Sequence, residues 1–175
     1  MDIKSKDNSL MVDISSIIKS EGADLKVEKV FPKSAFEEID RDFPLVSDVC
    51  LDGSITNLSG NLFLKGEVSF SVLFSCDRCL KEFQQDFCVI IDEVIAKDNA
   101  GFEKDEYIPY SGSKVLLTEG IYKTIYPLIL EKHLCSEDCK GLCAKCGCNL
   151  NFEECTCADE EIDPRLEKLK DFFKN

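Results

Sequence analysis

Cysteine thiols are the side chains of this 175-residue chain whose type and spacing indicate chemistry. One CxxC pair, Cys76 and Cys79, stands apart from a dense group near the C-terminus. That group comprises six thiols: Cys135, Cys139, Cys143, Cys146, Cys155 and Cys157. Two residues between cysteines let a tight turn aim both sulfurs at one ion, and a second pair completes the tetrahedral sulfur shell that zinc prefers. These eight cysteines are therefore the candidate metal ligands.

The ligand set stays open at this stage, because the candidates outnumber the four positions of one zinc site. The run Cys143-Ala-Lys-Cys146-Gly147 resembles a zinc knuckle, in which a glycine after the second cysteine lets backbone amides turn toward the sulfurs. Cys155 and Cys157 are candidates to complete that site.

Two metal sites are the alternative, with Cys76 and Cys79 folding over to meet Cys135 and Cys139. In either arrangement we expect structural Zn²⁺ rather than an iron–sulfur cluster, because nothing in the sequence marks a redox cofactor.

The remaining thiols and the only histidine are weaker matches to a ligand pattern. Cys50, Cys88 and Cys148 fit no ligand spacing and are predicted to be core or incidental thiols. His133 is an alternative ligand beside Cys135, or a packed or exposed side chain.

Cysteine content also bears on the compartment. Eleven cysteines would suggest disulfides in a secreted protein, but an odd number leaves at least one thiol unpaired. The first 16 residues lack the apolar run of a signal peptide, and no apolar stretch reaches the length of a membrane span. We therefore expect a cytoplasmic protein with reduced thiols and no membrane partner.

Enzymatic function is not expected. The segment Cys76-Asp-Arg-Cys79 is compatible with a redox dithiol, in which Arg78 would lower a thiol pKa. A thioredoxin-like motif opens a helix, however, whereas an alternating strand pattern resumes here by Phe83. No phosphate-binding glycine motif occurs, one histidine cannot build a His-rich catalytic site, and the acidic residues lie in solvated runs. We expect neither a catalytic residue nor a small-molecule substrate.

Alternating apolar residues between positions 45 and 95 predict three strands joined by short turns, and hence an antiparallel sheet. The first strand runs from Leu45 to Ile55, Leu58-Ser-Gly-Asn61 forms a turn, and the second strand delivers Cys76 at its end. An earlier strand is predicted over residues 25 to 31, and a loop over residues 97 to 113, with an extended stretch from Tyr107 to Tyr110 as an alternative within it.

Two helices are predicted after the sheet. The first begins near Thr118 as N-cap and ends or kinks at Pro127, after which residues 128 to 134 form an extended connector. The second opens with Asp163-Pro164 and places Leu166, Leu169, Phe172 and Phe173 on one face. The predicted fold is thus α+β. An antiparallel meander or partial barrel with a short helix occupies residues 1–130, and a cysteine-rich metal-binding module with a terminal helix occupies residues 131–175.

The formal net charge is −13, from 34 acidic and 21 basic residues. This sign is opposite to that of proteins that hold phosphates by themselves. Bound zinc does not reverse it, since four thiolates around Zn²⁺ leave a site at about −2. The acidity indicates either simple solubility or a basic partner.

These motifs together resemble the YceD family, also called large ribosomal RNA subunit accumulation proteins. The resemblance covers the chain from about residue 45 to its end. It is carried by these segments: Leu51-Asp-Gly-Ser-Ile, Cys76-Asp-Arg-Cys-Leu-Lys-Glu-Phe83, Cys135-Ser-Glu-Asp-Cys-Lys-Gly-Leu-Cys143, Cys146-Gly, Asn149-Leu-Asn151, Cys155-Thr-Cys157 and Asp163-Pro-Arg165. Two departures are Ala144, where the family commonly has proline, and Cys148, which adds a thiol.

The resemblance implies a role in accumulation of large-subunit ribosomal RNA and assembly of the large subunit, without catalysis. The expected partner is a large-subunit precursor, reached through a basic ribosomal protein or through rRNA contacts of Lys140 and Lys145. The alternatives are a CxxC-based thiol redox enzyme and a zinc-binding protein unrelated to ribosomes.

Overall fold

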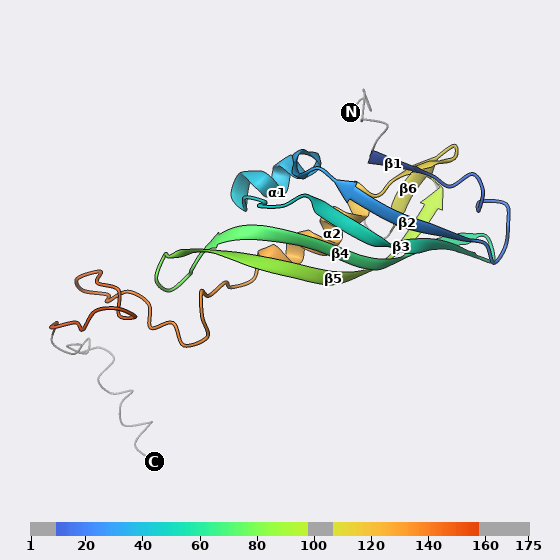
Figure 1. Cartoon of the computed structure of the whole chain (residues 1–175). Helices are drawn as coiled ribbons and strands as arrows, with labels where there is room; N and C mark the ends of the chain where they lie inside the picture. The colour runs from blue at the N-terminus through green and yellow to red at the C-terminus, as the bar shows by residue number, and fades with distance from the viewer. Residues whose placement is uncertain (1–9, 98–106, 158–175) are drawn as a thin grey trace, which may run out of the picture.

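The fold is a strongly curled sheet that carries a cysteine-rich segment at one end (Figure 1). The computed structural model describes residues 10–97 and 107–157. The predicted terminal helix from Asp163 onward lies outside these residues. The described strands are β1 (Met11–Asp13), β2 (Asp24–Phe31), β3 (Val49–Leu58), β4 (Asn61–Ser75), β5 (Glu82–Lys97), β6 (Ile108–Ser111) and β7 (Lys114–Leu116).

A long hairpin of β4 and β5 forms the centre of the sheet, as the alternating pattern predicted. Its strands are antiparallel and in register from Leu62 opposite Ile95 to Ser75 opposite Glu82. β3 joins β4 through Ser59 and Gly60, which both have positive φ, the backbone conformation of a two-residue hairpin turn. The CxxC lies at the opposite end of β4, in the turn that leads into β5.

The sheet is mixed, so the prediction of a wholly antiparallel sheet is wrong at one contact. The strand order is β1-β7-β6-β5-β4-β3-β2, and β6 pairs parallel to β5 with Ile108 opposite Ile95. β6 overlaps the stretch from Tyr107 to Tyr110 that the sequence left open as extended within the predicted loop, but its parallel pairing was not predicted. Strands of three or four residues, such as β6 and β7, are too short for an alternating pattern to reveal them or their direction.

Two glycines permit the curl of the sheet. Gly53 of β3 lies opposite Gly66 of β4, on the face that also carries buried Leu51 and Val68. A Cβ at Gly53 would lie 2.4 Å from the Lys65 carbonyl oxygen, and a Cβ at Gly66 would lie 2.4 Å from that of Asp52. Side chains at these two positions are therefore incompatible with the close strand approach. The curl brings the edge strands β1 and β2 near each other, and Lys29 Nζ donates to the Met11 carbonyl at 2.7 Å.

Helices cover one face of the sheet and leave the other face of β2–β5 to solvent (Figure 1). They are the 3₁₀ helix η2 (Lys33–Phe36), α1 (Glu37–Asp42) and α2 (Thr118–Ile129). α2 buries Ile121, Ile125 and Ile129 in the core that the sheet shares. No helix in the described ranges is long and apolar enough to cross a membrane.

The boundaries of α2 differ from the predicted ones. Leu117 is the N-cap and Thr118 is already helical, with no side-chain capping bond. Pro127 lies inside the helix, which continues to Ile129, so residues 128 and 129 do not belong to an extended connector. Pro127 has no N–H to donate to the carbonyl of residue 123, so it removes one hydrogen bond near the end of the helix without ending the helix there.

We predict that Gly66→Ala destabilises the fold by about 1–3 kcal/mol, the usual cost of forcing extra volume into a packed region. Urea unfolding followed by circular dichroism measures the change. Ser69→Ala is the matched control, because Ser69 is exposed on the same strand and already carries a Cβ. Equal unfolding midpoints for the two variants would show that β3 and β4 accommodate a Cβ at position 66 with no loss in the free energy of unfolding.

Candidate metal centres

Four thiols meet at the tip of the β4–β5 hairpin, and we call them the inner thiol group: Cys76, Cys79, Cys135 and Cys139. Their sulfurs lie within 4.8 Å of one another. Two pairs are closer, with Cys76 Sγ 3.8 Å from Cys139 Sγ and Cys79 Sγ 3.6 Å from Cys135 Sγ. The hairpin turn and a segment some 60 residues later in the chain therefore supply two sulfurs each.

Hydrogen bonds hold the hairpin tip against the later segment independently of the sulfurs. The Asp77 amide donates to the His133 carbonyl at 3.0 Å, and the His133 amide donates back to Asp77 Oδ2 at 2.8 Å. Arg78 Nη1 donates to the Cys139 carbonyl at 2.8 Å, and the Leu142 amide donates to the Arg78 carbonyl at 3.0 Å. The turn residues between the two cysteines thus position the second pair of thiols.

Burial separates the inner thiol group from bulk solvent. The side chains of Cys76, Cys79 and Cys139 are 0%, 5% and 3% exposed. Leu134 and Leu142 pack against them, together with Phe83 at the start of β5. Such closed surroundings are typical of structural metal sites, whereas catalytic sites keep a position open to substrate or water.

A second cluster lies in the loop that follows, and we call it the outer thiol group: Cys143, Cys146, Cys148, Cys155 and Cys157. The first four of these sulfurs lie within 4.8 Å of one another. Cys155 Sγ is 3.3 Å from Cys143 Sγ and 3.7 Å from Cys146 Sγ. The Cys157 amide donates to Cys155 Sγ at 3.3 Å, so Cys157 lies beside these four. This group is more open than the inner one, since Cys146 is exposed and the other four are half-buried.

Local backbone turns aim these sulfurs at a common point. The Cys143 amide donates to the Cys148 carbonyl at 2.9 Å and the Gly147 amide donates to the Cys143 carbonyl at 2.8 Å. Gly147 has φ +73°, a left-handed conformation that glycine adopts without strain. The predicted knuckle turn over residues 143 to 147 is therefore present.

Backbone amides also favour the thiolate forms that bind metal. Burial acts to raise the pKa of Cys76, but amide hydrogen bonds, led by that of Cys135, outweigh it and lower the pKa to about 6. In the outer group, amides of Cys146 and Lys145 lower the pKa of Cys143 to about 6. Because the thiolate is the ligand form, these amides prepare both groups to take a cation.

The sulfur spacing fits zinc. A tetrahedron with zinc–sulfur bonds of about 2.3 Å has neighbouring sulfurs about 3.8 Å apart. The closest contacts in both groups, 3.3 to 3.8 Å, lie near this value. They are far longer than a disulfide bond of about 2.05 Å, and all eleven cysteines are free thiols.

The structure brings all eight cysteines singled out from sequence into one or the other group. It also adds Cys148, which sequence spacing assigned to core or incidental thiols. The signal that could have found it is local, because a glycine turn at Gly147 folds Cys148 back toward Cys146. Cys50 and Cys88 lie far from both groups, exposed on the sheet.

His133 lies beside the inner thiol group but outside it. Its ring stacks on Phe74 with centroids 3.6 Å apart, Nδ1 lies 3.1 Å from Gln85 Oε1, and Nε2 lies 3.3 Å from the Ile129 carbonyl. Both ring nitrogens therefore have partners other than a metal, and the packed role that sequence left open describes this side chain.

The chain is similar to proteins of one known family. The family described as large ribosomal RNA subunit accumulation protein YceD matches residues 64–173, a range that contains both thiol groups. A chloroplastic YCED homolog 1 of Arabidopsis thaliana, named as a large ribosomal RNA subunit accumulation protein, is 22% identical over 70% of this chain and 48% of its own length. The Zea mays protein of the same name is 25% identical over 72% of this chain and 54% of its own.

An uncharacterized protein of Mycobacterium leprae is 25% identical over 94% of this chain and 77% of its own length. This chain spans about half the length of the chloroplastic relatives. No solved structure gave a significant match. Since the family match covers more than half of the chain and contains both thiol groups, this chain belongs to the YceD family of large ribosomal RNA subunit accumulation proteins.

Proposed function

We propose that this protein is a non-enzymatic factor in the accumulation of large-subunit ribosomal RNA and in assembly of the large subunit. It acts by binding a basic ribosomal protein within an assembly intermediate. Family membership and the names of the chloroplastic relatives support the ribosomal role. One observation carries the choice of a basic partner, namely a row of carboxylates on the uncovered face of the sheet.

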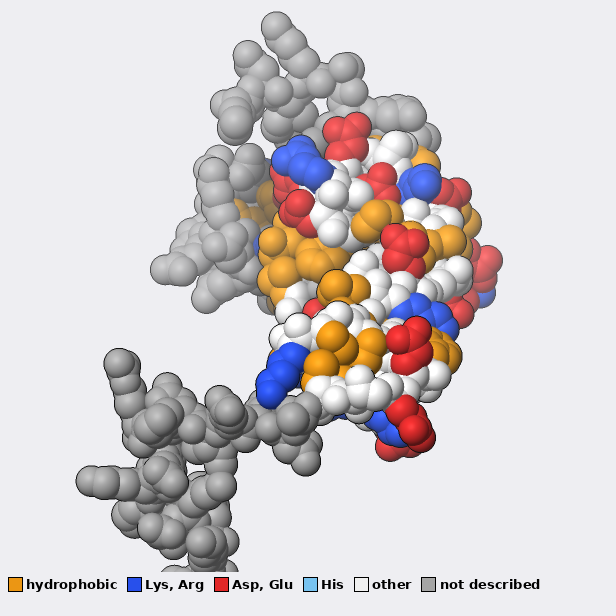
Figure 2. Space-filling view, turned by 90° about the vertical axis from the view of Figure 1, so that its left-hand side faces the viewer, with side chains coloured by type: hydrophobic (Ala, Val, Ile, Leu, Met, Phe, Trp, Pro, Cys, Tyr) orange, Lys and Arg blue, Asp and Glu red, His pale blue; other side chains and the backbone are white. Residues whose placement is uncertain are grey.

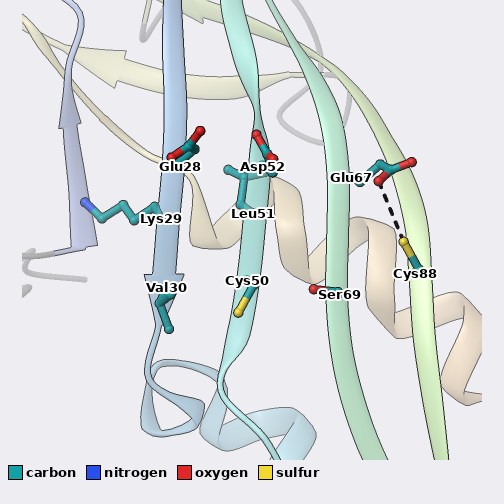
Figure 3. A pocket seen from close by; sticks show the side chains of 9 residues that line it. All are labelled: Glu28, Lys29, Val30, Cys50, Leu51, Asp52, Glu67, Ser69 and Cys88. Carbon is teal, nitrogen blue, oxygen red and sulfur yellow. Dashed lines mark hydrogen bonds between the residues drawn. The ribbon is translucent and has the colours of Figure 1, made fainter.

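This acidic row consists of Glu28, Asp52 and Glu67, which come from β2, β3 and β4 (Figure 3). The strand register places Asp52 directly opposite both of the others, and all three side chains are exposed. They line a shallow hollow of about 370 Å³. Like charges directly opposite on neighbouring strands repel, so the row is unfavourable in the isolated protein and a basic partner relieves the repulsion.

Exposed apolar side chains border the acidic row. Val30 is 61% exposed and Ile90, opposite Glu67 in the register, is 77% exposed. Lysine and arginine combine an apolar stem with a charged head, and both parts find contacts on this face. Lys26 forms an ion pair with Glu28, and both side chains are exposed. Exposed ion pairs contribute little to the free energy of folding, so a basic side chain of a partner can replace Lys26.

The charge distribution supports a protein partner over bare rRNA. The formal charge of −13 repels a polyanion. Figure 2 looks onto the end of the molecule that carries the thiol groups, and its coloured residues show acidic and basic side chains interspersed, with no continuous basic surface. Lys140 and Lys145 are exposed there, and they are the basis of the competing version, direct rRNA contact.

Zinc has a structural role in this proposal. The inner thiol group would hold Zn²⁺ and so fasten residues 131–157 to the hairpin tip. Burial of Cys76 and Cys79 supports this role over thiol redox catalysis, because a redox dithiol needs a sulfur that a substrate can reach.

We predict that neutralising the acidic row with Glu28→Gln, Asp52→Asn and Glu67→Gln weakens binding to a basic large-subunit protein by about 3- to 160-fold. The estimate assigns about 0.2–1 kcal/mol to each of three exposed ion pairs. Titration against individual purified ribosomal proteins at two salt concentrations measures the loss. The wild-type affinity should fall with salt, and the salt dependence of the variant should be smaller.

The matched control changes the same charge elsewhere, with Glu37→Gln, Glu38→Gln and Glu131→Gln, all exposed and outside the acidic row. If both triple variants weaken binding equally, the overall negative charge and not the acidic row would account for the binding. Gel shifts on protein-free rRNA test the competing version. Tight, salt-sensitive binding to that RNA, lost on substitution of Lys140 and Lys145, would overturn the basic-partner proposal.

For the inner thiol group we predict that Cys79→Ser removes one Zn²⁺ per chain, as measured by elemental analysis of purified protein. Hydrogen exchange at the Leu142 amide should accelerate, because its bond to the Arg78 carbonyl depends on the fastened tip. Cys88→Ser, at an exposed thiol of the same sheet, should change neither quantity. Unaltered zinc in Cys79→Ser would exclude this group as a metal site.

A further inference from the structure

The outer thiol group contains one sulfur more than a tetrahedral metal ion can use. Three of its members, Cys143, Cys146 and Cys155, contact one another at 3.3 Å and 3.7 Å. Cys148 Sγ lies within 4.8 Å of all three sulfurs, and the Cys157 amide donates to Cys155 Sγ at 3.3 Å, which places Cys157 beside the group. Zinc takes four sulfur ligands, so the two remaining thiols compete for one position.

Backbone amides distinguish the three shared sulfurs as preformed ligands. The Lys145 amide donates to Cys143 Sγ at 3.4 Å, and the Cys157 amide donates to Cys155 Sγ at 3.3 Å. Backbone hydrogen bonding from Cys148 lowers the pKa of the Cys146 thiol. Amide donors of this kind orient a thiolate and stabilise its charge, so these three positions are fixed by the turns that carry them.

Cys148 and Cys157 are the two further thiols beside those three sulfurs, and Cys148 is the one whose sulfur lies within 4.8 Å of all of them. Each follows a shared ligand by two residues, Cys148 after Cys146 and Cys157 after Cys155. Each is half-buried, and hydrogen bonding with Cys146 and Cys155 raises the pKa of each thiol to about 12. Neither belongs to the inner thiol group, whose four sulfurs are complete without them.

We propose that the outer thiol group binds a second Zn²⁺, with Cys143, Cys146 and Cys155 as constant ligands and with Cys148 and Cys157 as alternatives for the fourth position. One of the two is coordinated at any time and the other remains a free thiol beside the ion. The inner thiol group has four sulfurs for four positions and has no such alternative. The proposal concerns the metal site alone and does not depend on the ribosomal role.

Limited alkylation of the full-length, zinc-loaded protein tests the exchange directly. In this reaction a thiolate sulfur displaces iodide from iodoacetamide, which forms a carbon–sulfur bond while the thiol proton passes to buffer. Coordinated sulfurs react slowly and the uncoordinated one reacts quickly. Intact-mass and fragmentation spectra locate the labels in each molecule.

We expect rapid labelling of Cys50, Cys88 and one further cysteine, which is Cys148 in some molecules and Cys157 in others. The two labels should be mutually exclusive, because alkylation of one thiol leaves the other as the required ligand. Labelling of Cys148 alone would assign the fourth position to Cys157 and overturn the proposal. Labelling of Cys157 alone would overturn it in the opposite sense, as would rapid labelling of both in one molecule.

Zinc stoichiometry of serine variants provides the second measurement. Cys148→Ser and Cys157→Ser should each retain two Zn²⁺ per chain, whereas the double variant should retain one. This non-additivity is the signature of two side chains that serve one position. The double variant Cys50→Ser/Cys88→Ser is the matched control and should retain two.

Three results would contradict the redundancy: loss of an ion in either single variant, two ions in the double variant, or a single ion in the wild-type protein. Loss of both ions in the double variant would also contradict it, because the two groups share no ligand. A Co²⁺-loaded double variant that keeps the absorption of one tetrahedral sulfur site shows that the inner group remains folded.

Discussion

Convergence of four sulfurs at the hairpin tip is the constraint on which the described C-terminal segment depends. Between residues 131 and 157 the chain forms no helix and no strand beyond one isolated bridge, Leu142 with Asn149. Such a segment buries too little apolar surface to offset the conformational entropy lost on ordering it. Its fixed points are the inner thiols, the bonds around Asp77 and Arg78, and the turns of the outer group. Metal binding at these thiols would therefore be coupled to local folding.

The hairpin that supplies these fixed points also presents the acidic row. β4 ends directly before Cys76 and carries Glu67 near its middle, and antiparallel pairing sets β2, β3 and β4 side by side. One face of β4 carries the core residues Leu64 and Val68. The opposite face carries the charges, since successive side chains alternate between faces. The same strand thus links the core, the candidate partner surface and the metal centres.

Sequence reasoning located features whose cause is local and missed those whose cause is tertiary. Period-two alternation predicted β4 and β5. CxxC spacing predicted Cys76 and Cys79, in the turn between these strands, as ligands. Both signals lie within a few residues of sequence. The parallel pairing of β6 depends on how a distant segment returns to β5. The acidic row was equally invisible, because Glu28, Asp52 and Glu67 become neighbours only through strand register. Cys148 was set aside because the spacing rule does not include the turn at Gly147.

Zinc binding would make the protein more negative and would therefore favour a basic partner further. Each Zn²⁺ surrounded by four thiolates carries a net charge of about −2, so zinc at either thiol group adds negative charge to a chain already at −13. A zinc-ordered module of this kind cannot attract RNA through the metal. Any RNA contact would have to come from side chains such as Lys140 and Lys145, against the field of the whole molecule. A basic protein would experience that same field as attraction at long range and would meet the acidic row at contact, and these two effects are the physical grounds on which we propose a basic protein partner.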